Sequence, residues 1–270
     1  MKQLYTLSLF CCISFLLSCS VNKARIDNEL KQYFEKSGTE GCFTMLNNAD
    51  GEITVYNMAF DTMRVQPAGT FGIVNALIAL QAGILPDENT ALSLDSTFLN
   101  MDSLCNKNMN VKEALASDCV FFDQTLARKI GKANYQKWLD SISYGNKKTI
   151  GAVDSFWCNN QLAISPDEQL GLMKKLYFAQ LPFRKSVQES VAEMLLREDN
   201  SAYKLYYKNG FGLNAKKIPV EWTVGWIVEN RHVYFFSTLV ESKAGKSDSS
   251  TSLSITKNIL KHYGFFEGKK

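Results

Sequence analysis

Cysteine and histidine are the residues of this sequence with the widest choice of chemistry, so their number and spacing are the first test of function. The 270 residues include seven cysteines but only two histidines, His232 and His262. The cysteines after position 19 form no CxxC pair, and two histidines cannot build a histidine-rich site, so the spacing argues against zinc. We therefore expect no metal and no cofactor.

The number of cysteines does not decide which of them form disulfides. Three cysteines, Cys11, Cys12 and Cys19, lie near the N-terminus, and four remain for the folded part: Cys42, Cys105, Cys119 and Cys158. Four cysteines permit three pairings, and a fully reduced, buried set fits their positions equally well.

The N-terminus has the pattern of an export signal. Lys2 precedes the apolar run Leu4 to Leu17, which at about 14 residues is shorter than the roughly 20 of a membrane-spanning helix. The following Leu16-Leu17-Ser18-Cys19 resembles a bacterial lipobox, in which the signal is cut before a cysteine that is then diacylated. We expect residues 1–18 to be a signal peptide and Cys19 to carry the lipid. Residues 19–28 would then tether an extracytoplasmic domain to a bacterial membrane. An ordinary signal peptide ending near a cysteine is the alternative.

Composition limits the architecture and the partners. The 30 basic and 27 acidic residues leave a net charge of +3, too little to suggest a nucleic-acid binder. A hydrophobic content of 46% is enough for a real core. The polar stretch Ser242 to Ser250 is too short for a domain linker, and no internal repeat is visible. We expect residues 29–270 to form one domain.

Hydrophobic periodicity predicts strands at both ends of the chain and helices in the middle. Strands are expected at Gly41 to Leu46, Glu52 to Tyr56, Tyr203 to Lys208, Trp222 to Val228 and His232 to Val240, the first two joined by the turn Asn47 to Gly51. Helices are expected at Ile26 to Ser37, Thr70 to Gln81, Asp118 to Ile130, Asn134 to Leu139, Ser165 to Phe178 and Lys185 to Leu196, with a final helix ending near Gly264. This segregation is typical of an α+β fold with one antiparallel sheet built from both chain ends.

Short motifs along the chain occur in the order of a known family. They are Pro67 to Ile73 with Asn75 to Leu80, Tyr144-Gly145-Asn146, Phe156-Trp157, Leu181-Pro182-Phe183, Lys208-Asn209-Gly210 and Val224-Gly225-Trp226. Across residues 39 to 264 this series resembles class D β-lactamases. The resemblance implies the fold of serine β-lactamases and penicillin-binding transpeptidases, in agreement with the α+β prediction.

The resemblance also implies where the catalytic residues should stand. The family uses a serine nucleophile and a lysine three residues later, close enough to take its proton. Here these positions are Gly69 and Gly72. A second family motif has a serine two residues before a valine, and that position is Asp118, ahead of Val120. The family's nucleophile and base are therefore absent from their expected places.

The third family motif is partly kept. Lys208-Asn209-Gly210 retains a lysine and a glycine and has an amide in place of the hydroxyl, so Lys208 could attract a carboxylate and Asn209 could donate a hydrogen bond. The alternative is that Lys208 is a solvated strand residue. Trp157, which in the family contacts the modified catalytic lysine, is a further candidate binding residue, although packing is the more frequent role of a tryptophan.

Other serine and cysteine residues could in principle replace the missing nucleophile. Ser20/Lys23 and Ser254/Lys257 repeat the serine–lysine spacing, but the first pair lies in the tether and the second in the last helix. Ser117 is next to the substituted motif position, and Cys119 has an intrinsically reactive thiol without a histidine placed to activate it.

Together these patterns predict a catalytically inactive, lipid-anchored relative of class D β-lactamases. Its candidate ligands are cell-wall peptides and β-lactams, bound without a covalent bond, or an unidentified envelope protein. One alternative is an active β-lactamase or transpeptidase with an unusual nucleophile. Another is a structural interaction protein whose groove is closed.

Overall fold

The computed structural model describes residues 23–93, 105, 108–117, 119–242 and 250–270. The predicted signal peptide, Cys19, Ser20 and Asp118 lie outside these residues. Among the described helices, none is long and apolar enough to cross a membrane.

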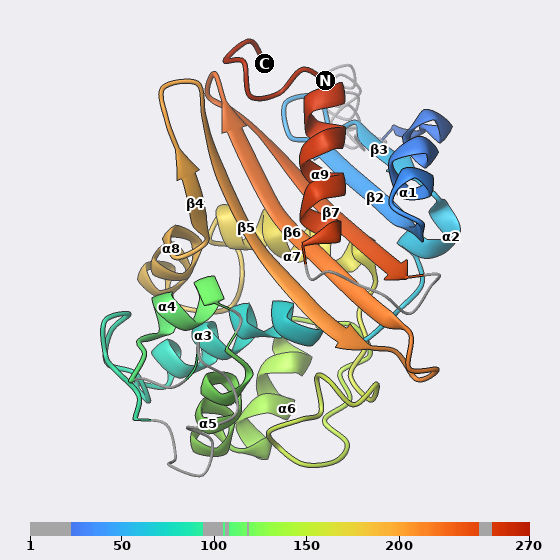
Figure 1. The fold of residues 1–270 in the computed structure, drawn as a ribbon. Helices are drawn as coiled ribbons and strands as arrows, with labels where there is room; N and C mark the ends of the chain where they lie inside the picture. The colour runs from blue at the N-terminus through green and yellow to red at the C-terminus, as the bar shows by residue number, and fades with distance from the viewer. Residues whose placement is uncertain (1–22, 94–104, 106–107, 118, 243–249) are drawn as a thin grey trace, which may run out of the picture.

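One sheet runs through the molecule (Figure 1). Its seven strands have the order β1-β3-β2-β7-β6-β5-β4. The strands are β1 (Ala24–Ile26), β2 (Thr39–Asn47), β3 (Ile53–Tyr56), β4 (Leu196–Asp199), β5 (Tyr203–Leu213), β6 (Pro219–Glu229) and β7 (His232–Ser242). All neighbours are antiparallel except β1 and β3. Because β2 pairs with β7, the predicted antiparallel sheet from both chain ends is confirmed.

Helices cover both faces of this sheet. They are α1 (Lys31–Lys36), α2 (Met58–Asp61), α3 (Gly72–Gln81), α4 (Val111–Ser117), α5 (Val120–Ile130), α6 (Lys132–Ser141), α7 (Pro166–Tyr177), α8 (Lys185–Glu193) and α9 (Thr251–His262), with 3₁₀ helices η1 (Asn28–Leu30) and η2 (Ala68–Phe71). Helices α1 and α9 pack on one face, and α7 packs on the other, next to the helical region formed by α3 to α6 (Figure 1).

Local signals set several element ends as predicted. Ser165 caps α7 because its Oγ accepts from the Glu168 N–H at 3.3 Å while the Ser165 N–H donates to the Glu168 carboxylate at 2.9 Å. Gly131 separates α5 from α6 with φ of 80°, a conformation that glycine adopts without strain.

The sequence prediction is wrong where distant pairing decides the structure. Residues Ala24–Ile26, placed in the tether, instead form β1 beside β3. The helix expected to reach Leu196 stops at Glu193, since Leu196 starts β4 and pairs with Tyr206. The expected helix from Asp118 is in fact α5, starting at Val120, and the separate helix α4 before it was missed.

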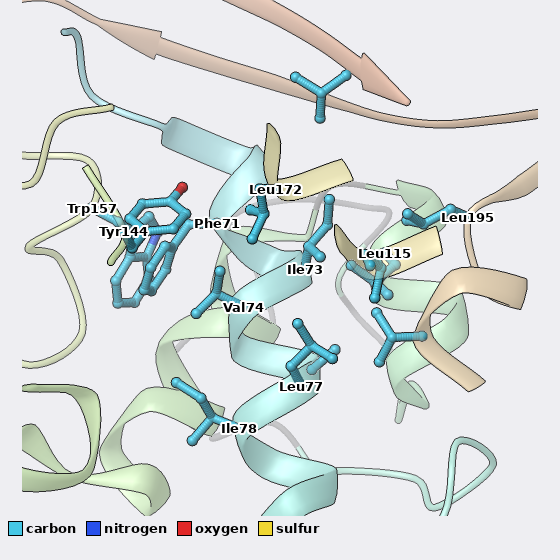
Figure 2. Packing of buried hydrophobic residues seen from close by; sticks show 14 of the residues in the cluster. Phe71, Ile73, Val74, Leu77, Ile78, Leu115, Tyr144, Trp157, Leu172 and Leu195 are labelled. Atoms are coloured by element: carbon cyan, nitrogen blue, oxygen red, sulfur yellow. The ribbon is translucent and has the colours of Figure 1, made fainter. Parts of the chain in front are cut away.

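Helix α3 is the centre of the larger hydrophobic core. Figure 2 shows Ile73, Val74, Leu77 and Ile78 projecting from this helix among side chains of neighbouring elements, with the aromatic rings of Phe71, Tyr144 and Trp157 together at its start. A smaller core lies between the sheet and helices α1 and α9. The start of α3 is therefore held rigidly by packing on several sides.

The structure resolves the choice among cysteine pairings. Cys105 and Cys119 form a disulfide, with their Cα atoms 5.7 Å apart. Cys42 and Cys158 are free, the first buried and the second exposed. Burial raises the pKa of the Cys42 thiol well above its usual value.

Candidate functional site

Gly69 and Gly72 lie where the chain enters the core. Gly69 belongs to η2 and Gly72 is the first residue of α3, in which nine of the ten residues are buried. Gly72 has φ of −51° and ψ of −31°, ordinary helical values that any residue adopts. Conformation therefore does not require glycine at position 72. We call these two bare positions the floor of the candidate site.

The turn that presents Gly69 is strained. Ala68 has φ of 49°, in the left-handed region, and its N–H donates to the Trp157 carbonyl at 3.2 Å. Such a conformation costs an alanine about 1–3 kcal/mol and persists only where surrounding contacts impose it. The position of the Gly69 backbone is thus set by the packing around it.

Strand β5 forms the opposite side of the site, which we call the wall: residues Lys208 to Phe211. The wall touches the floor at Gly210, where an added Cβ would lie 2.7 Å from the Thr70 nitrogen and 3.0 Å from the Gly69 nitrogen. Both contacts are with backbone atoms, which cannot yield. Glycine is therefore required at this position so that β5 can approach η2 so closely.

The outer edge of the wall has no strand beside it in the described part of the chain. Strand β4 pairs with β5 only up to Tyr206, and the Tyr207 N–H still donates outward to the Leu195 carbonyl at 2.9 Å. Because hydrogen-bonding direction alternates along a strand, the backbone groups of Asn209 and Phe211 also face outward. This segment can accept an extended ligand as an additional strand.

A pocket of 170 Å³ lies against this wall. Its lining includes the predicted residues Lys208, Asn209 and Gly210, together with Ser117 and Arg197. Lys208 is only 2% exposed, so the alternative of a solvated strand residue is wrong. Arg197 donates to the carbonyls of Met194, Leu196 and Leu115, and burial lowers the pKa of its guanidinium. Two basic side chains therefore border one small pocket.

Known proteins of similar sequence show the family to which this chain belongs. The family model described as "Penicillin binding protein transpeptidase domain" matches residues 35–261. The probable β-lactamase YbxI of Bacillus subtilis (strain 168) is 34% identical over 245 residues, which are 91% of this chain and 86% of YbxI. The chain belongs to the penicillin-binding transpeptidase family.

Within the family, its relatives include class D β-lactamases and a receptor domain. A solved class D β-lactamase from Bacillus subtilis is 31% identical, with a TM-score of 0.80 over 90% of this chain and 99% of the other. The C-terminal domain of the Bacillus licheniformis BlaR penicillin receptor is 26% identical, with a TM-score of 0.85 over 91% and 98% of the two chains. The predicted family resemblance is confirmed.

Trp157 occupies a packed position in this family member. It is 3% exposed and stacks on Phe71 with ring centroids 5.4 Å apart and an interplanar angle of 19° (Figure 2). It does not line the pocket beside Lys208. Its observed contacts are therefore packing contacts, and its proposed part in ligand binding stays a prediction.

Asn209 is oriented by neighbours across the sheet. Its Oδ1 accepts from the Thr223 hydroxyl at 3.0 Å, and that hydroxyl lies 2.9 Å from the Ser252 Oγ. With its oxygen engaged in this way, the Asn209 amide is held in a fixed orientation at the edge of the pocket.

The structure gives the alternative nucleophiles little support. Ser117 lines the pocket, but its Oγ is buried and has no hydrogen-bond partner in the part of the chain that the structure describes. Cys119 has no thiol because it pairs with Cys105. Ser254 and Lys257 lie on α9, where Lys257 pairs with Glu198 at 2.6 Å. His232 and His262 are exposed.

Asp123 is a site residue that the sequence reasoning missed. A Cβ on Gly72 would lie 3.2 Å from its Oδ2 and 3.3 Å from Leu115 Cδ2. Asn75 donates to the Asp123 Oδ1 at 2.9 Å, and the Tyr135 hydroxyl donates to the Asn75 Oδ1 at 2.7 Å. An acid next to Phe122 and three residues before Leu126, on the buried side of α5, was the available signal. Arg197 gave no comparable signal.

In the described part of the chain, a buried carboxyl that lacks a hydrogen-bond partner at one oxygen lies away from the pocket. Asp61 on α2 is 4% exposed, and its Oδ1 has no hydrogen-bond partner among the described residues. Burial, with a smaller contribution from the charge of Asp167, raises the pKa of Asp61 to about 7. The charge of this region therefore changes near neutral pH.

Proposed function

We propose that this family member binds a carboxylate-bearing peptide of the cell wall, or a β-lactam, without forming a covalent bond. The observation that carries the proposal is the contrast between floor and wall. Gly69 and Gly72 offer no side chain for nucleophile or base, whereas Lys208 is buried beside an open strand edge. A ligand could be held there and not be attacked.

The wall suggests how such a ligand would lie. An extended peptide would pair with the outward backbone groups of Asn209 and Phe211, and its carboxylate would reach the pocket bordered by Lys208 and Arg197. The BlaR domain named as a penicillin receptor has the same fold, and this likeness supports binding as the task of the site.

The first test measures binding and covalent capture together. The soluble domain, residues 23–270, is incubated with muropeptides and penicillins and followed by thermal shift and intact mass. We expect a ligand-dependent rise in melting temperature and no increase in mass. A stable penicillin adduct or turnover of a chromogenic cephalosporin would overturn the proposal and support an active enzyme, and Ser117→Ala would then identify or exclude that nucleophile. A flat thermal response to every ligand would favour the structural interaction protein.

The second test assigns the carboxylate. Lys208→Met should weaken the affinity for a muropeptide by about tenfold or more, since a charge-assisted hydrogen bond contributes about 1.5–3 kcal/mol. Lys204→Met is the matched control, an exposed lysine on the same strand. Amidation of the peptide carboxylate should cause the same loss with the unchanged protein. Equal affinities for the acid and the amide would exclude this pocket as the carboxylate site.

We further propose that Cys19 carries a lipid and anchors the domain, outside the cytoplasm, to a bacterial membrane. The support is the pattern of residues 1–19, a short apolar run ending in Leu16-Leu17-Ser18-Cys19. Incorporation of a labelled fatty acid that disappears with Cys19→Ser, together with release of the protein from the membrane fraction, is the expected result. Retention of the label in that variant would exclude this attachment site.

A further inference from the structure

Asp123, the acid next to Gly72, does not suit the acylation chemistry of the family. The Cβ direction of Gly72 points to two side-chain ends, the Asp123 carboxylate at 3.2 and 3.6 Å and the Leu115 methyl at 3.3 Å. Leu115 also lines the pocket beside Lys208. A side chain at position 72 would therefore meet the Asp123 carboxylate first.

Asp123 is anchored and cannot simply turn aside. Its Oδ1 accepts from Asn75, a residue of α3 with no exposed surface, and Asn75 in turn accepts from the fully buried Tyr135 on α6. Burial and the charge of Asp123 raise the pKa of the Tyr135 hydroxyl well above its usual value, so this donor keeps its proton. Three helices thus hold the carboxylate in one place.

A carboxylate at this point opposes the chemistry of a lysine base. A lysine takes a proton only in its neutral form, and an opposite charge within about 4–6 Å favours the charged form by about 1–3 pKa units. The neutral amine beside Asp123 would therefore be about ten- to a thousandfold scarcer than in a pocket without the acid.

We propose that Asp123 occupies the space into which the family's catalytic lysine would extend from position 72, and that it would slow acylation even in a chain whose two glycines were replaced by the family's serine and lysine. Asp123 would act indirectly, as a positioning residue: its carboxylate would hold an amine placed at position 72 in the charged form. This inference rests on the proposed function, because it adds a second obstacle to acylation at a site that we propose binds its ligand without a covalent bond.

The contact itself is tested by a double-mutant cycle in urea unfolding. Gly72→Lys and Gly72→Met are each made with Asp123 unchanged and with Asp123→Asn, which keeps an oxygen for Asn75 and removes the charge. We expect the unfolding constant to favour lysine over methionine by about threefold to tenfold more when the acid is present, and salt to reduce this difference. Coupling below twofold would overturn the placement.

The chemical consequence is tested in a chain with the family residues put back: Gly69→Ser, Gly72→Lys and Asp118→Ser. Labelling by a fluorescent penicillin is compared with and without the additional Asp123→Asn change. We expect at least tenfold faster labelling when the acid is removed. The matched control, Asp140→Asn, removes an exposed acid on α6 and should not change the rate. Equal rates with and without Asp123, including no labelling of either chain, would overturn the block.

The two proposals fail differently. The proposed function is decided by ligand binding to the unmodified chain, whereas the block by Asp123 is decided by the engineered chains. An unmodified chain that binds no muropeptide or penicillin would remove the function and leave the measured coupling intact.

Discussion

The wall on β5 and the floor at the start of α3 meet at Gly210 but differ in what they offer a ligand. The wall keeps a buried lysine, a glycine that permits close approach, and outward backbone groups at Asn209 and Phe211. The floor includes the strained Ala68, but the two positions where the family's reactive residues are expected are glycine. The wall thus has side chains and backbone groups that can form hydrogen bonds, whereas the two floor positions have no side chain.

A separate pH dependence of stability is expected from Asp61 on α2, away from the wall and the floor. The pKa of Asp61 is about 7 in the folded protein against 3.8 as its ordinary value. Its contribution to stability is therefore complete below pH about 4, falls as pH rises toward 7, and is gone above that. We expect a loss of at most about 4 kcal/mol across this window. Urea unfolding from pH 4 to pH 8 measures it.

Asp61→Asn should remove most of that slope, because the amide cannot ionise. Ligand affinity at the pocket should be the same in this variant and in the unchanged protein. A change in affinity as large as the change in stability would show that α2 and the pocket are coupled, and the wall and floor could then not be compared in isolation.

The next largest effect on stability is expected from the disulfide at the start of α5. Cys105 and Cys119 close a loop with a sequence separation of 14, for which chain entropy predicts a contribution of about 3 kcal/mol. The double change Cys105→Ser/Cys119→Ser should lower the free energy of unfolding by about that amount, measured by urea denaturation. Cys158→Ser, which removes an exposed thiol, should stay within about 0.5 kcal/mol. Equal stability of both variants would mean that packing alone holds α5 in place.

The sequence predicted the backbone of the site better than its electrostatics. Gly69, Gly72 and Lys208 could be located because short motifs around them follow the family order. In the structure Lys208 lines the pocket, and Gly210 on the same strand approaches the Gly69 nitrogen. Asp123 was missed because its importance depends on how α5 lies across α3, which no local pattern encodes. The same reason left the pairing of Cys105 with Cys119 undetermined and made the tether prediction wrong for strand β1, since both depend on contacts between distant segments.

The contact between wall and floor gives a smaller but more specific effect. Gly210→Val would place side-chain atoms against the backbone nitrogens of Gly69 and Thr70, and should cost about 2 kcal/mol as β5 moves away. Ligand affinity should fall with it. Gly171→Ala on α7 is the control, since no atom lies within 4 Å of its added Cβ and a helix interior favours alanine by about 1 kcal/mol. A Gly210→Val chain that keeps full stability and affinity would show that the two sides are not in rigid contact.

The smallest effect tests how firmly the floor is organised. Tyr135→Phe removes the hydroxyl that donates to Asn75 at 2.7 Å and leaves a buried oxygen without this donor, at a cost of about 1–2 kcal/mol. Tyr177→Phe, at an exposed tyrosine, should stay within about 0.5 kcal/mol. Because Asn75 then loses one of its two anchors, Asp123 should also be held less tightly. In the chain with Gly69→Ser, Gly72→Lys and Asp118→Ser, adding Tyr135→Phe should therefore speed penicillin labelling, but by less than Asp123→Asn does. If Tyr135→Phe accelerates labelling more than removal of the acid itself, the tyrosine acts on the pocket by a route other than Asp123, and the floor is not organised through this network.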